Sequence, residues 1–149
     1  MQLALDSSAV LAWVFQEPGW TVVDELISRT RDGEVALLLP GPVLTEVVYQ
    51  ARRQGNTRDA RGIAERLLAQ GFVVEPSVAG DLLPAAELME AAVNRTGIST
   101  TAQRAARLSL GDSLILAAVT RIGCPILTRD RLWLDLVDEG IVTARVRLL

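Results

Sequence analysis

Short apolar runs alternate along the chain with longer helical stretches. The apolar runs are rich in Val, Leu and Ile, which is typical of buried strands. They predict strands over Gln2–Leu5, Glu34–Leu39, Gly71–Glu75, Pro125–Leu127 and Ile141–Arg147. Helices are predicted over Ser8–Phe15, Trp20–Arg29, Pro42–Arg53, Arg58–Ala69, Leu83–Val93, Asp112–Ile122 and Arg131–Glu139. Because strands that alternate with helices form mostly parallel sheets covered on both faces, we predict an α/β fold.

Length and composition narrow the class of protein. A chain of 149 residues suits one domain, residues 1–149, and half of its residues are hydrophobic, unlike a disordered chain. No apolar run reaches the roughly 18 residues of a membrane span, and no basic segment precedes an apolar stretch at the N-terminus. We therefore expect no membrane anchor and no signal peptide. The single Cys124 cannot form an internal disulfide, which indicates a cytoplasmic protein.

Two missing residue types exclude several kinds of catalysis. The chain contains no histidine and no lysine, and all fifteen basic residues are arginine. The absence of His excludes Ser-His and Cys-His nucleophile pairs and any His metal site, and the absence of Lys excludes Walker-A phosphate binding and Schiff-base chemistry. Because guanidinium does not deprotonate near neutral pH, acid–base or metal chemistry falls to Asp and Glu. The net charge of −3 argues only weakly against a nucleic-acid partner, since the relevant potential is local.

Two aspartates follow predicted strands. Asp6 lies at the carboxyl end of the first strand, and Asp130 comes shortly after Pro125–Leu127 and opens the next helix. In open α/β sheets, ligands bind beyond the carboxyl ends of the strands, near the point where strand order reverses. Asp is also a preferred helix N-cap, worth about 1 kcal/mol. Both capping and ligand binding are therefore open for each residue.

Two further acids lie in apolar helices. Glu46 has Val43 and Tyr49 as helical neighbours, so its own face is not a charged one, and an exposed helix edge is the alternative. Asp112 opens a helix that is apolar on nearly every face, which indicates burial. A buried carboxylate is costly unless it is hydrogen-bonded, paired or bound to metal. The helix dipole, typically worth below about 1 kcal/mol at a surface, is too small to offset that cost.

These acids could meet at one edge of the sheet. Asp6 and Asp130 follow strands, whereas Glu46 and Asp112 lie near helix starts that are reached from strand ends. Carboxylates packed closely repel each other and raise one another's pKa values. A divalent cation would resolve this conflict, and hard oxygen ligands without His or Cys favour Mg²⁺, with Mn²⁺ as a substitute, over Zn²⁺. Such a metal would activate water for attack on phosphate esters.

Polar residues beside the acids could support this chemistry. Ser7, Ser8 and Thr128 could orient waters or ligating carboxylates. Arg129 and Arg131 flank Asp130 and are candidate phosphate contacts, with ordinary solvated arginines as the alternative.

Four motifs stand in order along the chain. They are D-S-S at Asp6–Ser8, T-E at Thr45–Glu46, L-S-L-G-D at Leu108–Asp112 and L-T-R-D at Leu127–Asp130. In this order and spacing the chain resembles the PIN-domain ribonucleases, specifically the VapC-like toxins of bacterial toxin–antitoxin pairs. The resemblance runs from Met1 to about Thr143.

The resemblance implies a three-layer α/β/α sandwich around a parallel sheet of about five strands. It also implies Mg²⁺-dependent endonucleolytic cleavage of RNA, a homodimer, and neutralisation by a cognate antitoxin protein. The family's acidic catalytic quartet maps onto Asp6, Glu46, Asp112 and Asp130, of which the three aspartates are the expected metal ligands. The family's polar accessory positions map onto Ser8 and Thr128.

Other interpretations stay open. A phosphatase on a similar sheet would need a second Asp at Ser8 and an essential Lys, and the chain has neither. A non-catalytic PIN-like binding module, in which the acids are helix caps, predicts that Glu46 and Asp112 point to solvent or to arginines. The segment Asn94–Arg107 is longer and more polar than the family pattern, and we expect an extra helix or a loop near the site there.

Tryptophans and arginines add a second candidate surface. The tryptophans, Trp13, Trp20 and Trp133, could stack on bases, although core positions are the commoner use. A band of arginines, Arg52, Arg53, Arg58, Arg61 and Arg66, could steer RNA or form a solvated face.

Overall fold

The computed structural model describes residues 1–95 and 107–149. Its strands are β1 (Gln2–Leu5), β2 (Ala36–Pro40), β3 (Val73–Glu75), β4 (Ile126–Thr128) and β5 (Val146–Leu148). Its helices are α1 (Ser7–Val14), α2 (Trp20–Arg31), α3 (Gly41–Arg53), α4 (Ala60–Leu68), α5 (Ala79–Val93), α7 (Leu110–Ile122) and α8 (Arg131–Asp138). Within these ranges, no helix has both the length and the apolar character that a membrane crossing requires. Most of the segment Asn94–Arg107, for which a helix or loop was expected, lies outside the described residues.

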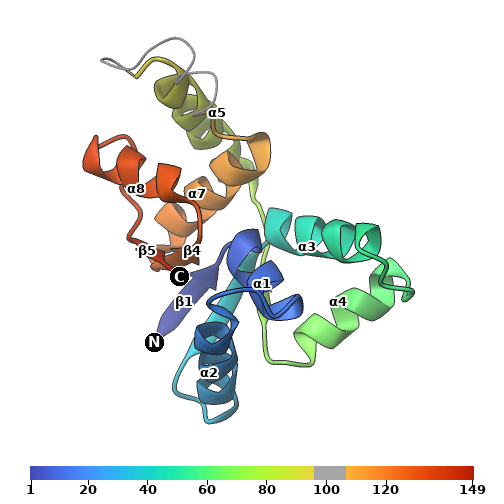
Figure 1. The fold of residues 1–149 in the computed structure, drawn as a ribbon. Coiled ribbons are helices and arrows are strands. Elements are labelled where there is room, and N and C mark those ends of the chain that lie inside the picture. Colours follow the sequence, from blue (N-terminus) through green and yellow to red (C-terminus); the bar gives the residue numbers. More distant parts are fainter. Residues whose placement is uncertain (96–106) are drawn as a thin grey trace.

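The five strands form one parallel sheet in the order β3-β2-β1-β4-β5. The chain adds β2 and β3 on one side of β1, and then crosses back to add β4 and β5 on the other side. Because such crossovers are right-handed, the two sets of helices cover opposite faces, with α1 to α4 on one side and α5, α7 and α8 on the other (Figure 1). The predicted α/β/α sandwich with five parallel strands is confirmed.

The central strands are mostly apolar, apart from Gln2 at the start of β1 and Thr128 at the end of β4, and they are buried on both faces. Their side chains are at most 6% exposed at Leu3, Ala4, Leu5, Leu37, Leu38 and Leu39. Successive strand residues point to opposite faces, so this pattern requires helices on both sides of the sheet. The unbroken apolar runs of the sequence therefore become the middle layer.

Strand β5 is shorter than predicted. The expected start at Ile141 is wrong, because the backbone N–H groups of Ile141 and Val142 donate to the Leu136 carbonyl at 2.9 and 3.0 Å. These bonds fold the chain back onto the end of α8, and the strand begins only at Val146. The apolar residues of this stretch cover the helix rather than extend the sheet.

Helix α5 begins four residues earlier than the predicted Leu83, at Ala79. The Asp81 carboxylate accepts a hydrogen bond from the Val78 backbone N–H at 2.9 Å, which satisfies a donor at the helix start. Pro84 lies inside the helix.

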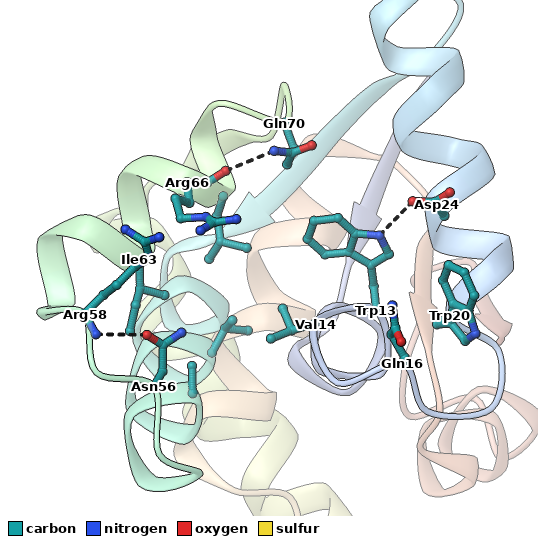
Figure 2. Close-up of a pocket in the computed structure, with 13 residues that line it drawn as sticks. Trp13, Val14, Gln16, Trp20, Asp24, Asn56, Arg58, Ile63, Arg66 and Gln70 are labelled. Carbon is teal, nitrogen blue, oxygen red and sulfur yellow. Dashed lines mark hydrogen bonds between the residues drawn. The ribbon is translucent and has the colours of Figure 1, made fainter.

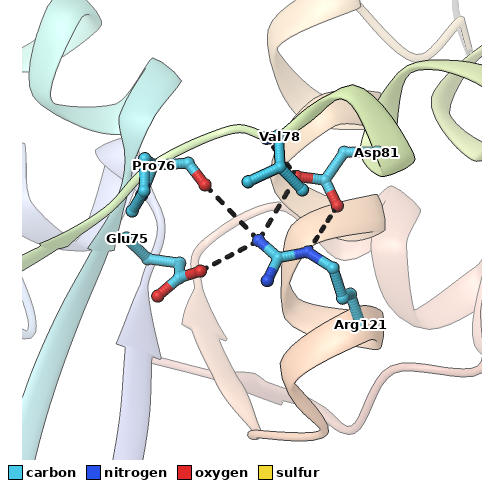
Figure 3. A network of polar contacts seen from close by, with 5 residues as sticks. All are labelled: Glu75, Pro76, Val78, Asp81 and Arg121. Atoms are coloured by element: carbon cyan, nitrogen blue, oxygen red, sulfur yellow. Dashed lines mark hydrogen bonds and ion pairs between the residues drawn. The ribbon is translucent and has the colours of Figure 1, made fainter.

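Asp81 is also the centre of a buried ion-pair network (Figure 3). It is 1% exposed, and Arg121 of α7 donates from Nε to its Oδ1 at 2.7 Å. The same guanidinium reaches Glu75 at the end of β3 at 2.9 Å. Burial alone would raise the pKa of Asp81, but the hydrogen bonds from Arg121 and from the Val78 N–H outweigh it and lower the pKa. The network ties α7 to α5 and β3.

A sharp turn brings β4 beside β1. Helix α7 ends at Gly123, whose φ of 68° lies in the left-handed region that disfavours other residues. The next residues run directly into the sheet, where the Ala4 N–H donates to the Pro125 carbonyl at 2.8 Å and the Asp6 N–H to the Leu127 carbonyl at 2.9 Å. Strand order reverses about this pair, so a crevice is expected at the carboxyl ends of β1 and β4.

Candidate active site

Asp6 lies directly after β1, where this crevice is expected, and is only 3% exposed. Its backbone carbonyl accepts the first hydrogen bonds of α1, but its side chain makes no capping bond. Instead, its Oδ2 accepts hydrogen bonds from Ser8 Oγ at 2.7 Å and from Thr128 Oγ1 at 2.8 Å. The side-chain cap that the sequence left open for Asp6 is therefore not formed.

Hydroxyl and backbone groups surround the Asp6 carboxylate. Burial raises the pKa of Asp6, hydrogen bonds from Ser8, Thr128 and the Ser7 backbone oppose that rise, and the charge of Asp112 adds to it. In residues 1–95 and 107–149, the hydrogen-bond donors to this carboxylate are hydroxyl and backbone groups, not arginine. A buried carboxylate with neutral donors is costly, and a bound cation would offset that cost.

Ser7 joins Asp6 to Glu46. The Ser7 hydroxyl donates to Glu46 Oε2 at 2.8 Å and lies 3.3 Å from Asp6 Oδ1. Glu46 is an exposed residue of α3, as the helix-edge alternative expected, but its carboxylate is bound to Ser7 rather than to an arginine. Helix α1 therefore contributes Ser7 and Ser8, and α3 contributes Glu46, to a network around Asp6.

Thr128 joins Asp130 to the same network. Thr128 is fully buried at the end of β4, and its Oγ1 donates to Asp6 and accepts from the Asp130 backbone N–H at 3.0 Å. The Asp130 carboxylate accepts from the Leu132 N–H at 2.9 Å and caps α8. In this structure the Asp130 carboxylate is therefore a helix cap, one of the two alternatives that the sequence left open.

Asp112 is also a cap, contrary to expectation. It is half-buried, and its carboxylate accepts from the backbone N–H and the hydroxyl of Ser109 at 3.1 and 2.7 Å, while Ser109 accepts from its N–H. The expectation that the Asp112 carboxylate is fully buried and has no local partner is wrong, because α7 begins at Leu110 and not at Asp112. A Ser three residues before an acid is a capping-box signature, which the sequence analysis missed.

The two candidate phosphate contacts differ in their surroundings. The Arg129 backbone N–H donates to Ser8 Oγ at 2.9 Å, but its guanidinium pairs with Glu17, which follows α1. Arg131 is exposed and makes no hydrogen bond or ion pair with the described residues. Glu17 lies far from Arg129 in the sequence, and no local pattern predicts their pairing.

The donor set suits a hard cation, although its acids are not gathered as a ready metal site. In the described ranges, no three Asp, Glu or Cys side chains are placed to hold one ion. Asp112 and Asp130 hold backbone N–H groups of their own helices, whereas Asp6 is buried with hydroxyl partners. Each cap uses one carboxylate oxygen, Oδ2 of Asp112 and Oδ1 of Asp130, so ligation by all three aspartates would use their other oxygens. The donors are otherwise oxygen atoms only, as Mg²⁺ prefers.

A separate groove of about 430 Å³ lies between helices α1 and α2 on one side and α3 and α4 on the other (Figure 2). Its apolar lining residues are Trp13, Val14, Trp20, Val47, Ala51, Ile63 and Leu67, and its polar ones are Gln16, Asp24, Asn56, Arg58, Arg66 and Gln70. Trp13 is fixed by a hydrogen bond to Asp24 at 3.0 Å and an edge contact with Phe72. Trp133, by contrast, is a core residue.

Comparison with known families identifies the chain. A model of the PIN domain matches residues 3–139. The chain belongs to the PIN domain family. The resemblance inferred from the four motifs is therefore confirmed, and it covers most of the chain. No curated protein sequence matches this PIN domain.

Solved structures share the fold of this PIN domain at low sequence identity. A chain in DNA-bound VapBC from Salmonella typhimurium is 12% identical, with a TM-score of 0.67 over 99% of this chain and 98% of that one. A chain in VapBC2 from Rickettsia felis, bound to a promoter DNA fragment, is 10% identical, with a TM-score of 0.65 over 100% of this chain and 99% of that one. VapC20 from Mycobacterium tuberculosis, a toxin that cleaves the sarcin–ricin loop, is 17% identical, with a TM-score of 0.61 over 96% of this chain and 98% of that one. These likenesses establish the fold.

Proposed function

We propose that this PIN domain is a Mg²⁺-dependent endoribonuclease that acts as the toxin of a toxin–antitoxin pair. One observation carries most of the proposal: Asp6 is a buried carboxylate at the switch point of the sheet, surrounded by hydroxyls and near a second acid, and no arginine among residues 1–95 and 107–149 neutralises it. This environment favours a cation at Asp6. RNA cleavage by a toxin is what the family resemblance adds.

Each residue of the site has a proposed part. Asp6, Asp112 and Asp130 would hold Mg²⁺, which when bound polarises a phosphoryl oxygen and lowers the pKa of a water. Ser8 and Thr128 fix the Asp6 carboxylate from two sides. Glu46 Oε2 is held by Ser7, and its carboxylate would accept a proton at the site. Because its guanidinium makes no hydrogen bond or ion pair with the described residues, Arg131 is the better candidate for binding a substrate phosphate.

Cleavage of RNA in Mg²⁺ tests this proposal. The substrates are total bacterial RNA and a sarcin–ricin loop oligonucleotide, incubated with Mg²⁺, Mn²⁺ or EDTA. We expect cleavage with either metal, none with EDTA, and a loss of at least about 100-fold in Asp6→Ala and in Asp112→Ala. Asp138→Ala removes an exposed carboxylate elsewhere on the surface and should cleave like the parent. Activity that persists in EDTA and in both site variants would refute the nuclease proposal.

The groove of Figure 2 is the surface that we propose for the antitoxin. Its lining combines apolar side chains with Arg58 and Arg66, and the stretch from residue 52 to residue 66 has five arginines against two carboxylates in a chain of net charge −3. Such a surface suits an amphipathic segment with acidic flanks. Two of the solved structures named above are VapBC assemblies bound to DNA. Charge reversal at Arg58 and Arg66 should weaken the complex without altering Mg²⁺-dependent cleavage.

A homodimer would cover the outer face of α5. This helix is apolar on nearly all sides, and Leu82 and Leu83 are 59% and 68% exposed. Apolar side chains at such exposure are typical of an interface. Light scattering should give a dimer for the parent and a monomer for Leu82→Glu, and a monomeric parent would remove this part of the proposal.

A non-catalytic binding module is the second candidate. The specific observation in its favour is that Asp112 and Asp130 already hold helix N-termini. This candidate predicts no stabilisation by Mg²⁺ and no cleavage of any RNA. It does not explain why Asp6 is buried among hydroxyls. Membership of the PIN family gives no support to the phosphatase alternative.

A further inference from the structure

Three hydroxyl groups lie around the two carboxylates of Asp6 and Glu46. Ser8 and Thr128 both donate to Asp6 Oδ2, at 2.7 and 2.8 Å. Ser7 is within hydrogen-bond distance of both carboxylates, at 2.8 Å from Glu46 Oε2 and 3.3 Å from Asp6 Oδ1. The two adjacent serines of the D-S-S motif therefore face different acids.

The Ser7 hydroxyl can serve only one of these acceptors at a time. A hydroxyl has one hydrogen, and ionised carboxylates only accept. The contact with Glu46 is shorter than the contact with Asp6 by half an ångström, and 2.8 Å is the ordinary length of such a bond. Asp6 already has two short bonds from other hydroxyls. The hydrogen of Ser7 therefore belongs to Glu46.

Glu46 has no other fixed partner in the described ranges. It is exposed on α3, and the Ser7 hydroxyl makes the one hydrogen bond to its carboxylate among residues 1–95 and 107–149. A Glu side chain has several rotatable bonds and loses much freedom when it is held in one position. Ser7, in contrast, is buried on the first turn of α1, and its hydroxyl bonds to no helix backbone group. The rigid residue can thus orient the flexible one.

We propose that Ser7 is a positioning residue that holds the Glu46 carboxylate towards Asp6, whereas Ser8 and Thr128 hold Asp6 itself. The inference rests on the proposed nuclease function for its effect on catalysis, but the contact that it describes is independent of that function. In this division of roles, loss of Ser7 acts through Glu46 and loss of Ser8 acts through Asp6. Ser8 is therefore the matched control for Ser7.

Structure and kinetics of the same variants test the inference. Crystal structures of the parent, Ser7→Ala and Ser8→Ala would be compared, together with single-turnover RNA cleavage in Mg²⁺. We expect the Glu46 carboxylate to leave its position in Ser7→Ala and to keep it in Ser8→Ala. Ser7→Ala should lower the cleavage rate about 10-fold to 100-fold, the range typical of residues that orient a site from behind. Ser7→Thr, which keeps the hydroxyl, should restore most of the rate.

A double substitution separates positioning from a structural role. If Ser7 acts through Glu46, Ser7→Ala should cause no further loss in a Glu46→Ala background, whereas Ser8→Ala should still cause one. An unmoved Glu46 in the Ser7→Ala structure, or an equal rate loss with and without Glu46, would overturn the inference. A parent that cleaves no RNA would refute the proposed function instead, and the Glu46 position in the crystal structures would still decide the role of Ser7.

Discussion

Asp6 and Asp81 are the two carboxylates that lie fully buried in the described part of the chain, at 3% and 1% exposure. Their pKa values nevertheless move in opposite directions. Asp81 has Arg121 at 2.7 Å, and its pKa is lowered in spite of burial. Among the described residues, the donors to Asp6 are hydroxyl and backbone groups, and burial raises its pKa. Two aspartates with almost no exposed surface thus differ: Asp81 is stabilised by a partly exposed arginine, whereas the charge of Asp6 is left costly.

The difference separates a structural acid from a functional one. Arg121 links Asp81 to Glu75, so that the pairing serves to fasten α7 to α5 and β3. Near Asp6, an arginine is available at Arg129, but its guanidinium pairs with Glu17 instead. A site that must accept a cation cannot also hold a permanent guanidinium. The unneutralised charge of Asp6 is therefore the feature that the proposed function explains.

The largest expected effect is on catalysis. Asp6→Asn should lower the RNA cleavage rate by about 100-fold to 1,000-fold, because the neutral amide cannot neutralise a bound cation. Asp81→Asn should stay within a few-fold of the parent at a temperature where both are folded, since Asp81 has no contact with the acids of the site. Initial rates with circular dichroism as a folding control measure this contrast. Equal losses in both variants would contradict it.

The next largest effect is on stability, where the substitution at Asp81 is the harmful one and the substitution at Asp6 is not. Asp81→Ala removes the partner of Arg121 and the acceptor of the Val78 N–H, and should lower the free energy of unfolding by about 1–3 kcal/mol. Asp6→Asn relieves a costly buried charge and should raise the free energy of unfolding by about 0.5–2 kcal/mol. Urea unfolding at neutral pH measures both. A destabilised Asp6→Asn would show that its charge is well solvated.

Asp6 and Asp112 both carry sequence signals that predict their surroundings. The place of Asp6 follows from its position directly after a buried strand, because the carboxyl ends of parallel strands meet at one edge. The Asp112 cap is a local pattern, a Ser three residues earlier, and was open to prediction. Local signals of this kind predict most of the strands and helices, whereas the strand order comes from the structure.

The contacts that the sequence does not predict are those between distant segments. Arg121 reaches Asp81 from another helix, and Ser7 reaches Glu46 across the packing of α1 on α3. Which arginine meets which carboxylate depends on the rotation and depth of each helix, and a hydrophobic pattern leaves these free within a turn. The environment that distinguishes Asp6 from Asp81 is therefore a tertiary property.

The pH dependence of stability follows from the two opposite shifts. Because the folded pKa of Asp6 is raised, the folded state binds more protons between the unfolded value of 3.8 and that raised pKa, and stability increases as pH falls through this window. Because the folded pKa of Asp81 is lowered, its contribution is present above 3.8 and is lost as pH falls through the folded pKa. Urea unfolding should be measured from pH 7 to pH 3. As pH falls, Asp6→Asn should lack the gain in the free energy of unfolding, and Asp81→Asn should lack the later loss. A parent-like profile in Asp6→Asn would contradict the assignment.

The smallest expected effect is thermal stabilisation by Mg²⁺. A ligand that binds only the folded state at ten times its dissociation constant adds about 1.4 kcal/mol, which for a chain of this size raises Tm by about 3–5 °C. The parent and Asp81→Asn should both show this increase in Tm. Asp6→Asn should not, because the bound cation would offset the cost of the buried Asp6 charge. Calcium at the same concentration controls for ionic strength and for general divalent binding. An equal gain in Asp6→Asn would place the Mg²⁺ elsewhere, and the contrast between the two buried aspartates would then be one of packing alone.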